Sequence, residues 1–263
     1  MTLNRGVIPP QRGGDLFIGW ARAPAVDRRF LLAAMPLTLA ATTGLGWLVA
    51  SELDDPGAGR WEQGATHIVE GVLEAKPYPM IRVADAAAPY GMRSVLVVAQ
   101  GKCTSGLKLA ALEGQRVKAS GVLIERKERR MLEVPLSVNR WLEPISPAGA
   151  APVAAPAVKS LGRARLAGQI MDSKCFFGVM RPGRGKTHKA CAALCIRGGI
   201  PPSFWVRDRK GHESVLLMTD AHGSPLGEAI LPLVADPVEA EGEIVRVGDL
   251  LQFRADAAEY QRV

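Results

Sequence analysis

The chain has 263 residues, a length that suits one or two domains, and it carries a formal net charge of +7. Its lysines and arginines are scattered over short segments with no interleaved aromatic residues. We therefore expect no nucleic-acid-binding groove, but a basic surface that suits anionic lipid. Aromatic residues make up only 5% of the chain, whereas 28 glycines and 19 prolines favour short strands and turns over long helices.

The long apolar segment of the chain covers residues 30–50. These 21 residues include no charged side chain, and about 20 apolar residues are enough to span the hydrocarbon core of a bilayer. Arg28 and Arg29 precede the segment, and three acidic residues follow it within five positions. The positive-inside rule therefore predicts that residues 1–29 stay in the cytoplasm, that 30–50 cross the bacterial inner membrane, and that the rest is periplasmic.

A cleaved signal peptide is the alternative for this segment. Signal peptides usually have an apolar region of about 7–15 residues with small residues at the cleavage site. Val49-Ala50-Ser51 could serve as such a site, but the apolar run is longer and the segment before it is unusually long. An uncleaved anchor is the expectation, and cleavage stays open as the alternative.

Two segments of low complexity divide the exported part of the chain. Residues 51–64 are expected to form a tether, and residues 144–162, rich in Ala and Pro, a semi-extended linker that cannot build a core of its own. The linker separates a first module, residues 65–143, from a second module, residues 163–263.

The two modules resemble each other in sequence. Val117–Ile124 and Val238–Val245 both read V-x-A-x-G-x-[LI]-[IV], and the alternation with period two predicts a half-buried strand in each. Each module also opens with a predicted strand around a glycine, Gly71 or Gly168, which indicates a bulge or sharp bend. We therefore expect a mainly β fold in which the membrane helix is followed by two tandem small OB-like β-barrels, with a generic β-sandwich as the alternative.

The second module is longer than the first between equivalent glycines. Gly71 and Gly121 are 50 positions apart, whereas Gly168 and Gly242 are 74 apart, so the second module has about 24 additional residues. Residues 174–199 are the candidate for this insertion, and they include three of the four cysteines in the chain.

The insertion combines cysteine and histidine at helical spacing. His188, Cys191 and Cys195 stand at i, i+3 and i+7 of a short predicted helix and therefore share one face. Cys175 ends the preceding strand and can close over that face. The pattern C-x12-H-x2-C-x3-C predicts four ligands for a tetrahedral zinc, or two or three thiolates for copper(I).

Disulfide bonds are the other interpretation of the same cysteines. An exported compartment favours them, and Cys175 could pair with Cys191 or Cys195, leaving the remaining cysteine free or bonded to Cys103. Cys191 and Cys195 are poorly placed to pair with each other because they are staggered along one helix. Four cysteines allow three complete pairings, so metal and disulfide both stay open.

No established catalytic motif is present in the sequence. The chain lacks C-x-x-C-H for haem, C-x-x-C for thiol exchange, G-x-S-x-G and H-E-x-x-H, so an enzyme is not favoured. The expected function is that of a membrane-anchored periplasmic accessory or binding protein. It would serve a redox or transport complex and contact another membrane or periplasmic protein. The alternative is a metal-handling (zinc or copper) or thiol-redox protein that acts through the insertion.

The second module resembles small exported bacterial proteins of unknown function. These combine a glycine-containing strand, a D-x-x-C motif, a loop with histidine, C-x3-C, a glycine-rich turn and a final barrel strand. The matching residues are Gly168, Asp172, Cys175, His188, Cys191, Cys195, Gly198 and Val238–Val245. The resemblance implies an OB-like barrel with a Cys/His insertion and no assigned activity; the membrane anchor and the first module depart from it.

Overall fold

The computed structural model describes residues 17–18, 21–22, 24–52, 59–104, 109–136, 141–146 and 155–263. The chain divides into two compact units, residues 1–55 and 56–263, and each is described by itself. In the first unit, the two-residue strands β1 (Phe17–Ile18) and β2 (Ala21–Arg22) pair antiparallel, and the helix α1 spans Ala25–Glu52.

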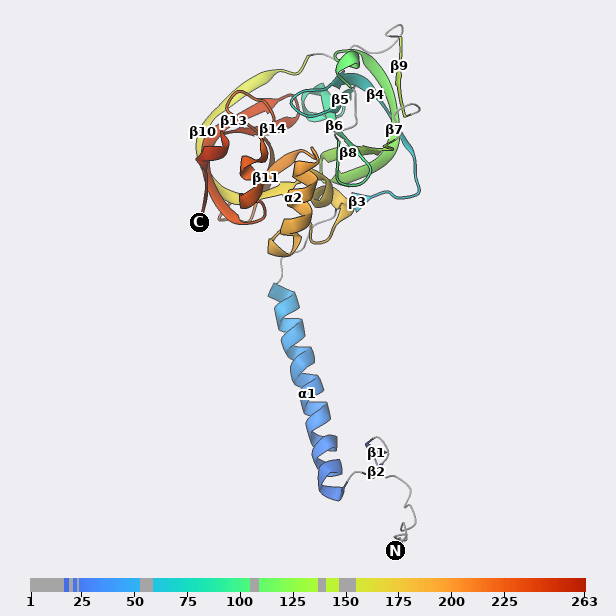
Figure 1. Cartoon of the computed structure of the whole chain (residues 1–263), viewed down its shortest axis with the longest axis vertical. Helices are drawn as coiled ribbons and strands as arrows, with labels where there is room; N and C mark the ends of the chain where they lie inside the picture. The colour runs from blue at the N-terminus through green and yellow to red at the C-terminus, as the bar shows by residue number, and fades with distance from the viewer. Residues whose placement is uncertain are drawn as a thin grey trace, which may run out of the picture. The chain divides into compact units, whose positions relative to one another are not determined.

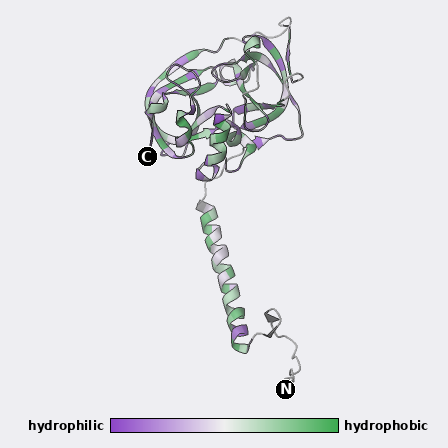
Figure 2. Cartoon of the chain, in the orientation of Figure 1, coloured by the Kyte–Doolittle hydropathy of each residue, from purple (hydrophilic) through white to green (hydrophobic). Residues whose placement is uncertain are grey.

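Helix α1 contains the apolar segment 30–50, which was predicted to span the membrane, and begins five residues before it. Thr38 and Thr42 donate hydroxyl hydrogen bonds of 2.8 Å to carbonyls one turn earlier, which satisfies their polarity within the helix. Figure 2 shows apolar colouring over most of α1, with hydrophilic residues close to its N-terminal end. Its length and composition are consistent with a membrane anchor or a signal sequence.

Five strands of the second unit form a first ring (Figure 1). They pair in the order β4-β5-β6-β8-β7, and β7 pairs with β4 to complete the ring. The pairing of β6 with β8 is parallel and the others are antiparallel. The strands are β4 (His67–Glu74), β5 (Met80–Ala84), β6 (Met92–Ala99), β7 (Arg116–Arg126) and β8 (Arg129–Val134), with β3 (Arg60–Trp61) and β9 (Leu142–Pro144) added along β7.

The C-terminal strands form a closed five-strand barrel with the same order. β10-β11-β12-β14-β13 is closed by the pairing of β13 with β10, and β12 with β14 is again the parallel pair. This order is that of an OB-like barrel and confirms the predicted mainly β class. The strands are β10 (Val158–Asp172), β11 (Pro202–Arg207), β12 (Glu213–Thr219), β13 (Pro237–Val247) and β14 (Leu250–Arg254), with β15 (Tyr260–Arg262) beside β13.

Gly71 and Gly168 occupy equivalent places where the first strand of each ring changes partners. β4 pairs with β7 up to Val72 and with β5 from there on, and β10 passes from β13 to β11 at Gly168. A Cβ at either glycine would lie 2.1 or 2.2 Å from a carbonyl oxygen of the neighbouring strand. The bulge in β10 lies elsewhere, between Ser160 and Gly162, so these two glycines permit close strand approach rather than a bulge.

The two rings pack against each other through one apolar cluster. Met80 and Met131 of the first ring lie in the same buried cluster as Phe176, Trp205 and Leu250 of the second ring. β10 begins at Val158, inside the segment predicted as a linker, while residues 147–154 lie outside the described part of the chain. The rings therefore share a core and do not act as separately buried modules.

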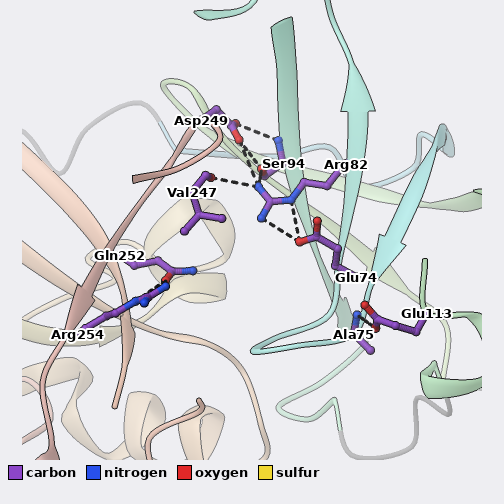
Figure 3. Close-up of polar contacts among 9 residues, drawn as sticks. All are labelled: Glu74, Ala75, Arg82, Ser94, Glu113, Val247, Asp249, Gln252 and Arg254. Atoms are coloured by element: carbon purple, nitrogen blue, oxygen red, sulfur yellow. Dashed lines mark hydrogen bonds and ion pairs between the residues drawn. The ribbon is translucent and has the colours of Figure 1, made fainter. Parts of the chain in front are cut away.

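A buried arginine joins the two rings by polar contacts. Arg82 on β5 is 2% exposed, and its guanidinium contacts Glu74 at 2.9 Å within the first ring. It also lies 3.7 Å from Asp249 and 3.4 Å from the carbonyl oxygen of Val247 in the second ring, and Ser94 contacts both Arg82 and Asp249 (Figure 3). The positive charge of Arg82 at the boundary between the rings is therefore balanced by the carboxylates of Glu74 and Asp249.

Candidate metal centre

The segment between β10 and β11 holds the Cys/His insertion. β10 ends at Asp172, and a π-helical turn, η3 (Cys175–Val179), follows it. Asp172 Oδ1 accepts a 2.7 Å hydrogen bond from the backbone N–H of Cys175, which sets the start of this turn. A 3-10 turn, η4 (Lys186–His188), then leads into α2 (Lys189–Arg197), one residue later than the predicted helix start.

Three sulfur atoms of the insertion lie close together. Cys175 Sγ is 3.9 Å from Cys191 Sγ and 4.0 Å from Cys195 Sγ. A disulfide bond needs about 2.05 Å between its sulfurs. Two thiolates on a tetrahedral zinc, each about 2.3 Å from the ion, are about 3.8 Å apart. The sulfur spacing therefore fits ligands that share one ion.

His188 is buried beside Asp172. Its Nε2 lies 3.0 Å from Asp172 Oδ2, and the side chains are 2% and 0% exposed, respectively. Because a carboxylate accepts, Nε2–H donates and the lone pair of Nδ1 remains for a cation. Carboxylate–histidine pairs of this kind orient imidazole ligands at metal sites.

Cys175 belongs to two overlapping groups of potential ligands. Its sulfur, one His188 ring nitrogen and Cys191 Sγ lie within 4.8 Å of one another, and so do the ligand atoms of Asp172, Cys175 and Cys195. The structure thus places the four predicted ligands, Cys175, His188, Cys191 and Cys195, in two groups that share Cys175, and it adds Asp172 to the second group. Cys175, His188 and Cys195 are buried, whereas Cys191 is half-buried.

The first ring contributes a cation that the sequence did not predict. Lys102 Nζ, in the loop after β6, lies 2.6 Å from Cys191 Sγ and 3.8 Å from Cys195 Sγ. This loop packs directly on the end of α2, since a Cβ at Gly198 would lie 1.8 Å from the carbonyl oxygen of Lys102. Thr104 fixes the contact through hydrogen bonds of 2.8 Å to the carbonyls of Gly198 and Gly199.

A second lysine, Lys174 of the insertion itself, holds the same loop in place. Lys174 is 2% exposed and donates to the carbonyl oxygens of Ala99 at 2.8 Å and Gly101 at 2.7 Å. Its ammonium also pairs with Glu133 Oε1 at 2.6 Å, and Trp61 donates to the other oxygen of that carboxylate. The ion pair is fully satisfied, and it holds the Lys102 loop against the sulfur cluster.

The sulfurs and Lys102 alter one another's protonation. Cys195 accepts from the thiol of Cys175, which lowers the pKa of Cys195 and, with burial and Asp172, raises the pKa of Cys175. The contact with Cys191 raises the pKa of Lys102 despite its partial burial. The cluster therefore favours a negatively charged sulfur next to a retained ammonium.

Cys103 stands apart from the cluster, although it follows Lys102 directly. Its sulfur lies 3.9 Å from the carbonyl oxygen of Gln100, and it joins neither group of potential ligands. All four cysteines lie in the described part of the chain, and each is a free thiol.

No family model and no curated protein matches the chain. Among solved structures, the chain is similar to a deletion mutant of the single-stranded DNA-binding protein from Thermus aquaticus. The two are 14% identical, the match covers 78% of this chain and 87% of that chain, and the TM-score is 0.21. A likeness at this level carries no argument about ligands, and the fold described above rests on the strand pairings.

Proposed function

We propose that the chain is a membrane-anchored periplasmic protein that binds one soft metal ion through Cys175, His188, Cys191 and Cys195. The observation that carries the proposal is the position of Cys175 Sγ, which lies within 4.0 Å of the two other sulfurs and in one group of potential ligands with the carboxylate-oriented imidazole of His188. Such donors suit zinc and copper(I) far better than calcium or magnesium. Two tandem OB-like barrels would then serve as the rigid frame for this centre.

The charges around the centre favour zinc over copper(I). Three thiolates, the buried Asp172 carboxylate and a divalent ion leave two excess negative charges, of which the Lys102 ammonium beside Cys191 offsets one. Copper(I) would leave three excess charges, and Lys102 would again offset only one. We therefore propose zinc as the resident ion and copper(I) as the alternative.

Metal analysis of the full-length chain tests this proposal. The protein is purified in detergent under anaerobic, reducing conditions, loaded with zinc, desalted, and analysed for zinc and copper per chain. We expect about one zinc per chain, as in structural sites with four protein ligands. Cys175→Ser should lose the ion because Cys175 belongs to both groups of ligands.

Cys103→Ser is the matched control, since it changes a cysteine outside the cluster and should keep the ion. Circular dichroism of both variants shows whether the β structure is retained. A well-folded wild-type protein that cannot be loaded with zinc or copper contradicts the proposal.

The anchor suggests that the centre serves a complex in the same membrane. Helix α1 is long and apolar enough to cross a bilayer, and anchoring raises the local concentration of a protein near membrane partners. We propose a membrane or periplasmic redox or transport complex as the partner. Recovery of a stoichiometric partner with the detergent-solubilised chain supports this role, and recovery of a lone monomer counts against it.

A further inference from the structure

The three clustered cysteines differ in their access to solvent. Cys175 and Cys195 are 3% and 1% exposed, whereas Cys191 is half-buried. A reagent from solution therefore reaches Cys191 first. Behind it stands Cys175 Sγ, 3.9 Å away, close enough to form a bond after a shift of about 2 Å between the sulfurs.

Lys102 contacts the same half-buried sulfur. Its ammonium lies 2.6 Å from Cys191 Sγ and 3.8 Å from Cys195 Sγ, so a positive charge stands beside the sulfur that a reagent reaches first. The anchored loop keeps this contact in place, because Lys174 and Thr104 hold the loop on both sides of Lys102. Cys191 is thus both the most accessible sulfur of the cluster and the one in contact with a cation.

We propose that the centre is a redox switch, in which a disulfide between Cys191 and Cys175 replaces the metal ion. This inference rests on the proposed metal-binding function and adds its regulation. The Cys191 thiolate attacks a disulfide of the oxidant, forms a mixed disulfide and releases one thiolate of the oxidant. Cys175 Sγ then attacks Cys191 Sγ, forms the internal disulfide and expels the second thiolate. The two protein thiolates lose two electrons, and the disulfide of the oxidant gains them as two thiolates.

Metal binding and this disulfide exclude each other. Cys175 belongs to both groups of potential ligands, so the bond to Cys191 removes a sulfur from each group. His188 and Cys195 alone would leave zinc with two of its four ligands, which is too few for a structural site. The oxidant class is a disulfide, either of a small thiol compound or of a protein thiol oxidant.

Treatment of the zinc-loaded, full-length chain with oxidised glutathione tests the switch. Zinc release is followed with a chelating dye, and the bond is located by peptide mass mapping without reduction. We expect one zinc released and one Cys175–Cys191 disulfide for each oxidised glutathione consumed. Cys103→Ser should behave as the wild type, because Cys103 lies outside the cluster.

Two variants separate the steps. Cys175→Ser, tested in the metal-free chain, lacks the sulfur that expels glutathione, so glutathione should stay bound to Cys191. Lys102→Gln should slow the first attack because it removes the cation beside Cys191 Sγ that attracts the anionic oxidised glutathione, whereas Lys186→Gln, which changes a charge of the same insertion, should leave the rate unchanged. Retention of zinc and free thiols after oxidation overturns the switch while leaving metal binding intact. A bond that excludes Cys191 overturns its role as the point of attack, and a reduced chain that binds no zinc overturns the proposed function itself.

Discussion

Asp172 organises the candidate centre although it was not predicted as a ligand. One carboxylate oxygen faces His188 Nε2 at 3.0 Å, and the other accepts the backbone N–H of Cys175 at 2.7 Å. The side chain is fully buried, so both contacts act without competition from water. A single residue therefore orients one imidazole and one thiol of the cluster.

Replacement of Asp172 by Asn should weaken zinc binding while the fold is retained. Asn keeps the size of the side chain but removes the charge that favours the Nε2–H tautomer of His188. Loss of a carboxylate that hydrogen-bonds to a metal-binding histidine lowers the affinity for the metal by roughly 10–100-fold. Competition with a chelator of known affinity measures the change. An unchanged affinity would show that Asp172 does not orient His188.

The sequence could predict the ligands within the insertion but not their neighbours from the first ring. Helical spacing places Cys191 and Cys195 on one face, and short separation along the chain brings Cys175 near them. Lys102 is 89 positions from Cys191, and the contact depends on how the two rings pack. No local pattern encodes that packing, so Lys102 could not be found from periodicity.

At the scale of elements, α2 is held at its N-terminal end by an ion-pair network. Lys189, the first residue of α2, donates to Asp236 Oδ2 at 2.6 Å. Arg262 on β15 contacts the same oxygen at 2.9 Å. These contacts connect the helix that carries Cys191 and Cys195 to β15, which lies beside the barrel strand β13.

Asp236→Asn should lower the free energy of unfolding by about 1 kcal/mol at pH 7, the upper range for partly exposed pairs. Lys189, helped by Arg262, lowers the pKa of Asp236 below the value of about 3.9 in an unfolded chain. A lowered carboxyl pKa contributes stability above the unfolded pKa, and this contribution is lost as the pH falls through the folded pKa.

Urea unfolding at pH 7 and at stepwise lower pH measures this dependence, and the difference between variant and wild type should shrink below about pH 4. Glu241→Gln, which changes an exposed carboxylate paired with Arg163, is the control and should have little effect at either pH. A difference for Asp236→Asn that persists unchanged in acid would exclude the ion pairs as its cause.

The strands were largely predictable because apolar and polar residues alternate along a strand that buries one face. The predicted strand Val117–Ile124 lies within β7, and Val238–Val245 lies within β13, both extended at their ends. β10 contains the predicted strand around Gly168 but begins as early as Val158, within the segment predicted as a linker. Its first residues are exposed and pair with β13 through the backbone, so hydropathy alone does not reveal them.

At the scale of the whole molecule, the shared core of the two rings is the feature that sequence patterns did not indicate. An Ala/Pro-rich stretch predicts separation of two modules, but it does not report whether their surfaces meet. The buried cluster that joins Met131 to Phe176 and Leu250 shows that they do. Arg82 adds polar contacts across the same boundary, as Figure 3 shows.

Arg82→Met should destabilise the paired rings by about 1–3 kcal/mol, because it leaves the partly exposed carboxylates of Glu74 and Asp249 without their common partner. Chemical denaturation measures the loss. Arg163→Met is the matched control, since this arginine forms an exposed pair with Glu241 and its removal should cost at most about 1 kcal/mol. Equal effects of the two substitutions would argue against Arg82 as a link between the rings.

The orientation of the chain across the membrane is a property of the whole molecule. Arginines before the apolar segment 30–50 and acidic residues after it predict a cytoplasmic N-terminus and a periplasmic C-terminus. Alkaline phosphatase, which is active only after export, should therefore be active when fused after Val263. Activity of a fused cytoplasmic reporter at that position instead would reverse the predicted topology.

X-ray absorption at the zinc edge of the zinc-loaded, full-length chain identifies the atoms that bind the ion. We expect about three sulfur ligands near 2.3 Å and one nitrogen near 2.0 Å, from Cys175, Cys191, Cys195 and His188. Cys103→Ser should give the same spectrum. A zinc shell of oxygen and nitrogen without sulfur would contradict the assignment of the cysteine cluster as the metal centre.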